Sequence, residues 1–220
     1  SNAVGTVNDV AAVCRLAHGV GAMCYVDAVH YAPHGPIDVR ALDCDFLVCS
    51  PYKFFGPHVG ALYGKREHLA RLRPYKVRPA ADEAPDCWET GTQNHEGIAG
   101  IAAAIDYLAE LGARSAGPGK APTSRREELL SAMCAIREYE SRLTARLIHG
   151  LLAIPGLTVY GITDAKRAGW RTPTISVRIT GHSPRDLSRS LAGRGIFAWD
   201  GNYYAINLTD LLGVEDTGGM

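Results

Sequence analysis

"DAVHYAPHGPIDVRALDCDFLVCSPYKFFGPHVGALYG", residues 27–64, places reactive side chains directly behind two apolar, strand-like runs. Asp27 follows CYV, and Ser50 and Lys53 follow FLVC. In open α/β sheets, ligands lie beyond the carboxyl ends of the strands. If the two runs form parallel neighbouring strands, the acid and the amine therefore converge on one crevice.

The sequence around this stretch predicts helices that alternate with strands. Apolar residues recur at helical spacing over residues 7–21, 65–73 and 96–112. Short apolar runs predict strands over 22–28, 45–50 and 60–64. This alternation indicates an α/β fold with a mostly parallel sheet covered by helices. Such near-continuous apolar strands are typical of a sheet that is buried on both faces.

The second half of the chain predicts a smaller α+β domain. A segment rich in Gly, Ala, Ser and Pro indicates a linker, so we expect a first domain at 1–112, a linker at 113–124 and a second domain at 125–220. In the second domain we expect helices over 126–153 and 183–194, and strand-like segments over 156–162, 172–179, 195–200 and 202–208.

The composition is that of an ordinary globular protein and excludes several functional classes. The 220 residues are 46% hydrophobic and 21% charged, with a formal net charge of +0. This balance gives no electrostatic basis for binding nucleic acid or an anionic membrane. No apolar run approaches the roughly 20 residues that a membrane-spanning helix needs. No signal peptide is visible, and we expect a cytoplasmic protein.

The cysteines predict neither a metal site nor a redox motif. None of the six forms a C-x-x-C pair. Cys24, Cys44 and Cys49 lie in or beside apolar runs, which indicates buried small hydrophobes in a reducing compartment. A catalytic thiol among the six is the alternative, and no pattern supports it.

The Asp and Lys pair suggests a particular cofactor chemistry. A lysine that forms a Schiff base needs a partly desolvated site to lose its proton. An aspartate beside a pyridine nitrogen keeps that nitrogen protonated and strengthens the ring as an electron sink, which is the protein's part of pyridoxal 5'-phosphate (PLP) chemistry. The alternative is that Asp27 caps a turn and Lys53 is a solvated loop residue.

The stretch at 27–64 resembles the core signature of the class V aminotransferases, PLP-dependent enzymes of fold type I that include the cysteine desulfurases. The resemblance continues through SNAVGT at 1–6 and CWETGTQNHEGIAGIAAAIDYL at 87–108. It implies part of a large PLP-binding domain, a smaller and incomplete C-terminal α+β domain, and a homodimer. It is most similar to the branch described as cysteine desulfurase-like.

The resemblance implies roles for individual residues around the cofactor ring. Lys53 resembles the Schiff-base lysine, and Asp27 resembles the acid paired with the pyridine nitrogen. His30 stands where the family has Gln or His near the phenolic oxygen of the ring. Asn2 resembles the Asn that contacts this oxygen or the substrate carboxylate.

It also implies residues near the cofactor phosphate. Ser50 resembles a phosphate ligand at the end of its strand. Tyr52 occupies a position where many desulfurases carry His, and its hydroxyl would reach the phosphate or the substrate. Thr92 resembles the Thr that reaches the phosphate of the neighbouring subunit's cofactor. We expect loop or supporting roles for His34 and His58.

These features predict a truncated portion of a PLP-dependent enzyme that acts on an amino acid, with Lys53 and His30 as catalytic residues. Cysteine desulfurase activity is not expected, because no Cys follows Cys134 to carry a persulfide. The alternatives are an aminotransferase, a racemase or a β-lyase. From another class, the alternative is a catalytically silent binding or scaffold fragment, since the family's upstream phosphate loop has no counterpart in these residues.

Overall fold

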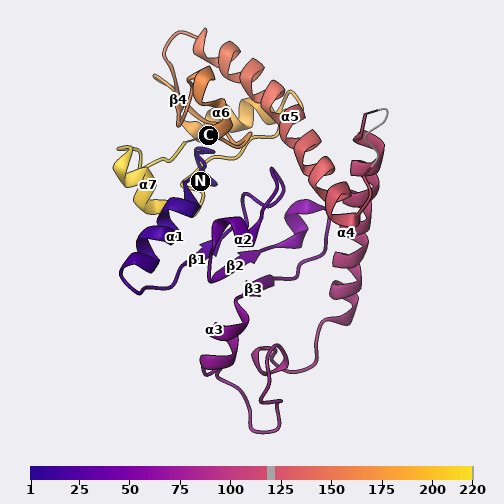
Figure 1. Ribbon diagram of the computed structural model, residues 1–220. Coiled ribbons are helices and arrows are strands. Elements are labelled where there is room, and N and C mark those ends of the chain that lie inside the picture. Colours follow the sequence, from indigo (N-terminus) through magenta and orange to yellow (C-terminus); the bar gives the residue numbers. More distant parts are fainter. Residues whose placement is uncertain (118–121, 220) are drawn as a thin grey trace. The chain divides into compact units, whose positions relative to one another are not determined.

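The computed structural model describes residues 1–117 and 122–219 and forms two compact units (Figure 1). One unit is Asp9–Ile136, and the other combines Ser1–Asn8 with the chain from Arg137 onward. Part of the predicted linker, 118–121, lies outside the described residues. Helix α4 (His95–Ser115) extends into the predicted linker, and the division into domains at 113–124 stays a prediction.

The Asp9–Ile136 unit contains a three-stranded sheet in the order β1-β2-β3. Its strands are β1 (Tyr25–Asp27), β2 (Phe46–Cys49) and β3 (Ala61–Gly64). β1 and β2 are parallel, with Asp27 opposite Val48. β3 is antiparallel to β2, because the connection between them carries only the short 3₁₀ helix η1 (Pro51–Phe54) and no crossover helix. The carboxyl ends of β1 and β2 therefore lie at one edge of the sheet.

The apolar runs predict that the sheet is buried on both faces. This prediction is wrong for the two outer strands, β1 and β3. Tyr25 on β1 is 60% exposed, and Leu62 on β3 is 51% exposed. Both strands lie at the edges of the described sheet. Of the three strands of this sheet, only β2, which has a neighbour on each side, begins with two buried residues, Phe46 and Leu47.

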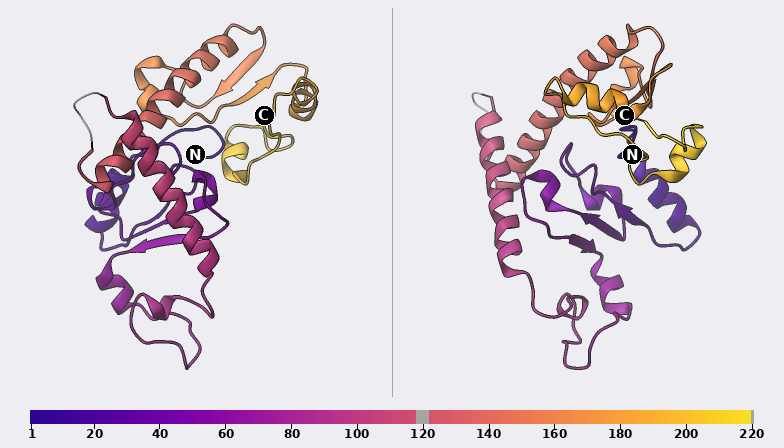
Figure 2. Two further views of the ribbon diagram at one scale, coloured as in Figure 1. Left: turned by 90° about the vertical axis from the view of Figure 1, so that its right-hand side faces the viewer. Right: turned by 180° about the vertical axis from the view of Figure 1, so that it is seen from behind.

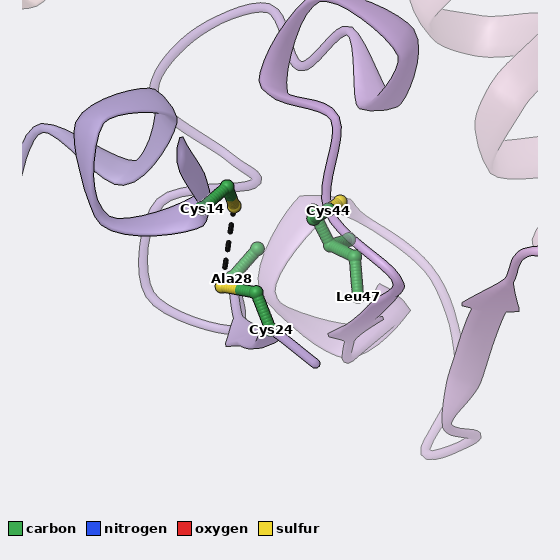
Figure 3. Packing of buried hydrophobic residues seen from close by; sticks show 5 residues of the cluster. All are labelled: Cys14, Cys24, Ala28, Cys44 and Leu47. Carbon is green, nitrogen blue, oxygen red and sulfur yellow. Dashed lines mark hydrogen bonds between the residues drawn. The ribbon is translucent and has the colours of Figure 1, made fainter. Parts of the chain in front are cut away.

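A small apolar core joins helix α1 (Val10–Gly19) to the sheet. Its buried members, drawn in Figure 3, are Cys14, Cys24, Ala28, Cys44 and Leu47. The Cys14 thiol donates to the sulfur of Cys24 across 3.2 Å. Burial raises the pKa of Cys14 to about 12, so its thiol stays protonated and packs as an apolar group. The predicted burial is confirmed for Cys24 and Cys44, whereas Cys49 is only partly buried.

Aspartate side chains cap the first two helices of this unit, α1 and α2. α1 begins at Val10, later than predicted, because the Asp9 side chain accepts a hydrogen bond from the amide of Ala12. Helix α2 (Val39–Leu42) has Asp38 as its cap. The remaining short helices of the unit are α3 (Arg66–Arg71) and the 3₁₀ helix η2 (Asp86–Trp88).

A buried carboxylate, Asp45, links α1, β2 and α3. Its Oδ2 accepts from the backbone amide of Cys24 at 2.7 Å and lies 2.9 Å from Nε2 of His18. Its Oδ1 lies 2.8 Å from Nε2 of His68 and 3.1 Å from Nζ of Lys65. Burial by itself would raise the pKa of Asp45, but these hydrogen bonds outweigh burial and lower it. Asp45 therefore stays ionised inside the unit.

Helix α5 (Arg125–Leu152) crosses the end of α4 with its first turns (Figure 2). Their backbones come into close contact at Gly112, where a methyl group would collide with the carbonyl oxygen of Glu128. The hydroxyl of Ser131 also donates to the Gly112 carbonyl at 3.1 Å. Ala132, in the same contact, is fully buried. The absence of a side chain at Gly112 thus allows the two helices to meet.

Replacing Gly112 with alanine tests this contact. We expect Gly112→Ala to lower the free energy of unfolding by about 1–3 kcal/mol, because overpacking against backbone is not easily relieved. Gly150→Ala in α5 is the matched control, since no atom lies within 4 Å of its added methyl. That variant should gain about 0.5–1 kcal/mol from helix propensity. Urea unfolding measures both, and equal stabilities would contradict the close approach at Gly112.

The second unit is a small α+β arrangement. Strands β4 (Leu157–Tyr160) and β5 (Ser176–Ile179) pair antiparallel, and the 3₁₀ helix η3 (Ala165–Trp170) lies between them in the chain. Helix α6 (Pro184–Ala192) follows, capped by the hydroxyl of Ser183. The first residues of the chain join this unit, because the amide of Thr172 donates to the Gly5 carbonyl at 2.8 Å.

The strands predicted at 195–200 and 202–208 are wrong. Residues 196–200 have no regular structure, and residues from Ile206 onward form helix α7 (Ile206–Leu211). Tyr203 and Tyr204 have φ angles of 55° and 59°. This left-handed backbone breaks an extended strand. Among the described residues, no helix is both long and apolar enough to cross a lipid bilayer.

Candidate functional site

Asp27 lies at the carboxyl end of β1, where the chain enters a turn. Its Oδ1 accepts a hydrogen bond from the amide of Val29 at 2.9 Å, so Asp27 does cap a turn. The amide of Ala28 continues the ladder by donating to the Val48 carbonyl at 2.9 Å. Asp27 is exposed, and its second carboxylate oxygen can accept from a ligand.

Lys53 lies on η1, directly after β2. The turn begins at Ser50, whose side chain makes no capping bond, and the amide of Lys53 donates to the Ser50 carbonyl at 3.0 Å. Phe55 then adopts a left-handed φ of 70°. A Cβ at Gly56 would lie 2.7 Å from Cβ of Pro51, so the tight return of the chain requires glycine. The side chain of Lys53 thus extends from a tight turn of the backbone.

His30 lies in the turn that follows β1. Burial lowers the pKa of His30 to about 4, with His34 and, to a smaller extent, Lys53 among the positive charges that act in the same direction. The rings of His30 and His34 meet edge to face, with centroids 5.3 Å apart. His30 is therefore neutral near physiological pH. A neutral imidazole can exchange hydrogen bonds with a ligand without repelling the lysine ammonium.

Tyr52 and His58 form a stacked pair beside Lys53. Their ring centroids are 4.8 Å apart with an interplanar angle of 12°. Nζ of Lys53 lies over the Tyr52 ring, 5.7 Å from its centroid. The two aromatic rings and the amine therefore form one continuous contact. The sequence predicts only a loop or supporting role for His58, and no periodicity in the sequence signals this stack.

Most, but not all, of the predicted site residues lie in the turns that follow the two parallel strands. Within the Asp9–Ile136 unit, the turns after β1 and β2 carry Asp27, His30, Ser50, Tyr52 and Lys53. Thr92 lies in this unit too, between η2 and α4, and its side chain is exposed.

Asn2 belongs to the other unit. Its Nδ2 donates to the carbonyl of Tyr203 at 2.7 Å, and the Tyr203 hydroxyl donates to the Trp199 carbonyl at 3.0 Å. This pair of bonds links the start of the chain to the left-handed turn that replaces the predicted strands. In the Asp9–Ile136 unit, the indole of Trp88 on η2 donates to the Leu69 carbonyl at 3.0 Å.

The side chains at the edge of β1 and β2 fit PLP by their chemistry. The aldehyde of PLP requires an amine, which Lys53 can supply, and its pyridine nitrogen requires a carboxylate, which Asp27 can supply. The neutral imidazole of His30 suits the phenolic oxygen. The hydroxyls of Ser50 and Tyr52 suit the phosphate. No group of His, Cys, Asp and Glu suited to a metal ion occurs among the described residues.

The fold is fold type I, the fold of a large class of PLP-dependent enzymes. The family model Aminotransferase class-V matches residues 1–121. The chain belongs to this family, whose members are in general PLP-dependent.

The relatives support this assignment over the whole chain. A cysteine desulfurase of Pectobacterium atrosepticum is 33% identical over 227 residues, covering 97% of this chain and 49% of the relative. The apo structure of a cysteine desulfurase from Thermococcus onnurineus has a TM-score of 0.83 at 25% identity, covering 100% of this chain and 52% of that one. The cysteine desulfurase CsdA of Escherichia coli has a TM-score of 0.75 at 28% identity, covering 100% and 51%. The chain spans about half the length of these relatives.

Proposed function

We propose that the chain is part of a PLP-dependent enzyme that acts on an amino acid. The observation that carries this proposal is that Asp27 and Lys53 lie in the turns that follow the parallel strands β1 and β2, which end at one edge of the sheet, with His30 in the first of these turns. This arrangement combines a nucleophilic amine, an acid and a neutral imidazole at the edge where open α/β sheets bind ligands.

Each of these residues has a defined task in the proposed reaction. PLP, when bound, supplies an electron sink for charge that develops at the α-carbon of the substrate. Lys53 would hold the cofactor through Nζ, and its free amine would move a proton at the α-carbon of the substrate, as base and then as acid. Asp27 holds a proton on the ring nitrogen. His30 is neutral and therefore accepts or donates a hydrogen bond at the phenolic oxygen.

The same proposal covers the phosphate, the assembly and the compartment. The hydroxyls of Ser50 and Tyr52 bind the phosphate, and Asn2 binds the phenolic oxygen or the substrate carboxylate. Thr92 reaches a phosphate held by a second copy of the chain, so the enzyme is a homodimer, and it acts in the cytoplasm. The reaction is that of a cysteine desulfurase-like transferase or lyase, or else that of an aminotransferase, racemase or β-lyase.

A titration of the chain with PLP tests the proposal. We expect a saturable absorbance band near the visible edge, because a lysine adduct absorbs differently from free PLP. Borohydride should remove this band and leave a pyridoxyl group that peptide mapping locates on Lys53. A titration without a saturable band, or a pyridoxyl group spread evenly over the lysines, would instead identify a catalytically silent fragment.

A further inference from the structure

The loop that carries His58 is held in place by helix α4. Gly97 of α4 packs closely against the side chain of Val59, and a Cβ at Gly100 would lie 3.0 Å from Cγ of Pro57. The amide of Val59 also donates to the Pro57 carbonyl at 2.9 Å. The residues on both sides of His58 therefore rest on a long helix, although His58 itself is exposed.

From this support, the imidazole of His58 reaches Tyr52. The two rings lie nearly parallel, at 12°, with centroids 4.8 Å apart. The Tyr52 side chain is 45% exposed, so the surrounding protein restrains it little. Stacking on a ring that is anchored through its neighbours limits the rotation of Tyr52 about its side-chain bonds.

Tyr52 in turn contacts the amine of Lys53. Nζ lies over the Tyr52 ring at 5.7 Å from the centroid, within the range of a cation–π interaction. Lysine has a long, flexible side chain, and such a contact narrows the positions that its amine visits. The contacts thus run from Gly97 and Gly100 through His58 and Tyr52 to the amine.

We propose that His58 is a positioning residue, which acts through Tyr52 to hold the amine of Lys53 where it reacts with an aldehyde. This inference rests on the proposed function for the identity of the aldehyde, PLP. The ring of His58, rather than its protonation, provides the effect, because stacking requires an aromatic face. Phenylalanine at position 58 should therefore replace it, and alanine should not.

The stack itself can be tested without any cofactor. In spectra of the 220-residue chain labelled with ¹³C-tyrosine, His58→Ala should move the Tyr52 ring signals, because the ring current of His58 is lost. His58→Phe should keep a ring-current shift, and His149→Ala, which removes an exposed histidine of α5, should leave the Tyr52 signals unchanged. Tyr52 signals that are the same in the wild-type and His58→Ala chains would overturn the proposal.

The effect on Lys53 is measured by labelling with PLP and borohydride. The initial rate of pyridoxyl labelling at Lys53 should fall about three- to tenfold in His58→Ala, the range expected for loss of one aromatic contact. The rate in His58→Phe should stay near that of the wild type. Tyr52→Leu should slow labelling at least as much, because it removes the ring contact and also a proposed phosphate ligand. Adding His58→Ala to Tyr52→Leu should slow labelling no further.

The outcomes separate this inference from the function on which it rests. If Lys53 is labelled at the same rate in the wild type and in His58→Ala, the positioning role is overturned and the proposed function stands. If Lys53 of the wild type is labelled no faster than the other lysines, the proposed function is contradicted. It would also overturn the claim that the contact prepares Lys53 for an aldehyde, whatever the tyrosine spectra show of the stack.

Discussion

Replacing Lys53 with alanine is expected to abolish the covalent attachment of PLP, without unfolding the chain. Lys53 is exposed on η1, and the turn is held by backbone bonds and by Pro51 and Gly56, none of which involve the lysine side chain. The variant should therefore keep the circular dichroism of the wild type. Its absorbance on titration with PLP should match that of free PLP at every concentration.

The matched control for this prediction is Lys166→Ala. Lys166 is also exposed and lies in the other unit, on η3. This variant should form the adduct as fully as the wild type, and borohydride should fix it on Lys53. An adduct that survives in Lys53→Ala, with the pyridoxyl group mapped to another lysine, would show that the reactive amine has been assigned to the wrong residue.

Replacing Asp45 with asparagine is expected to produce a large loss of stability. The carboxylate is only 3% exposed and interacts with His18, Lys65 and His68. Breaking a buried ion pair costs about 3–5 kcal/mol in general. We expect Asp45→Asn to lower the free energy of unfolding by about 3 kcal/mol, because the side chains of His18, Lys65 and His68 keep some contact with water. Urea unfolding near neutral pH measures this difference.

The loss should depend on pH in a defined direction. The pKa of Asp45 is lowered in the folded chain, so its contribution is fully present above the unfolded value of about 3.9 and is lost as the pH falls through the folded value. The stabilities of the wild type and Asp45→Asn should therefore begin to converge below about pH 4, and the difference should shrink further as the pH falls toward the lowered pKa of Asp45.

The control is Asp82→Asn, which removes a carboxylate that is 92% exposed and pairs with Lys76 at 2.8 Å. An exposed pair contributes about 0–1 kcal/mol, so this variant should unfold almost as the wild type does. A difference between the wild type and Asp45→Asn that stays constant from neutral to acidic pH would argue against an ionised Asp45 as the source of the stability.

Much of the site could be predicted because its residues are close to each other in the chain. Asp27 and Lys53 each follow a short apolar run, and strand position alone places such residues at a common edge when the strands are parallel. The resemblance of 27–64 to the class V aminotransferases added roles that spacing could not supply. The match of the family to residues 1–121 confirms that resemblance.

The region from 195 to 208 shows where local pattern misleads. Apolar and aromatic residues there have high strand propensity, yet no strand pairs with them among the described residues. The Asn2 side chain bonds to the Tyr203 carbonyl, and two successive tyrosines take left-handed backbone angles. A contact between residues so far apart in the chain leaves no periodic signal.

The sequence by itself determined the α/β class, the burial of Cys24 and Cys44, and the pairing of an acid and an amine behind two strands. These properties depend on hydrophobic periodicity and on residue type, which are local. Only the tertiary structure decided that Asp45 is a buried, ionised link between helices, and that His58 stacks on Tyr52. Both depend on side chains that folding brings together, since hydrogen bonds and ring contacts act over a few ångströms in space, however far apart the residues lie in the chain.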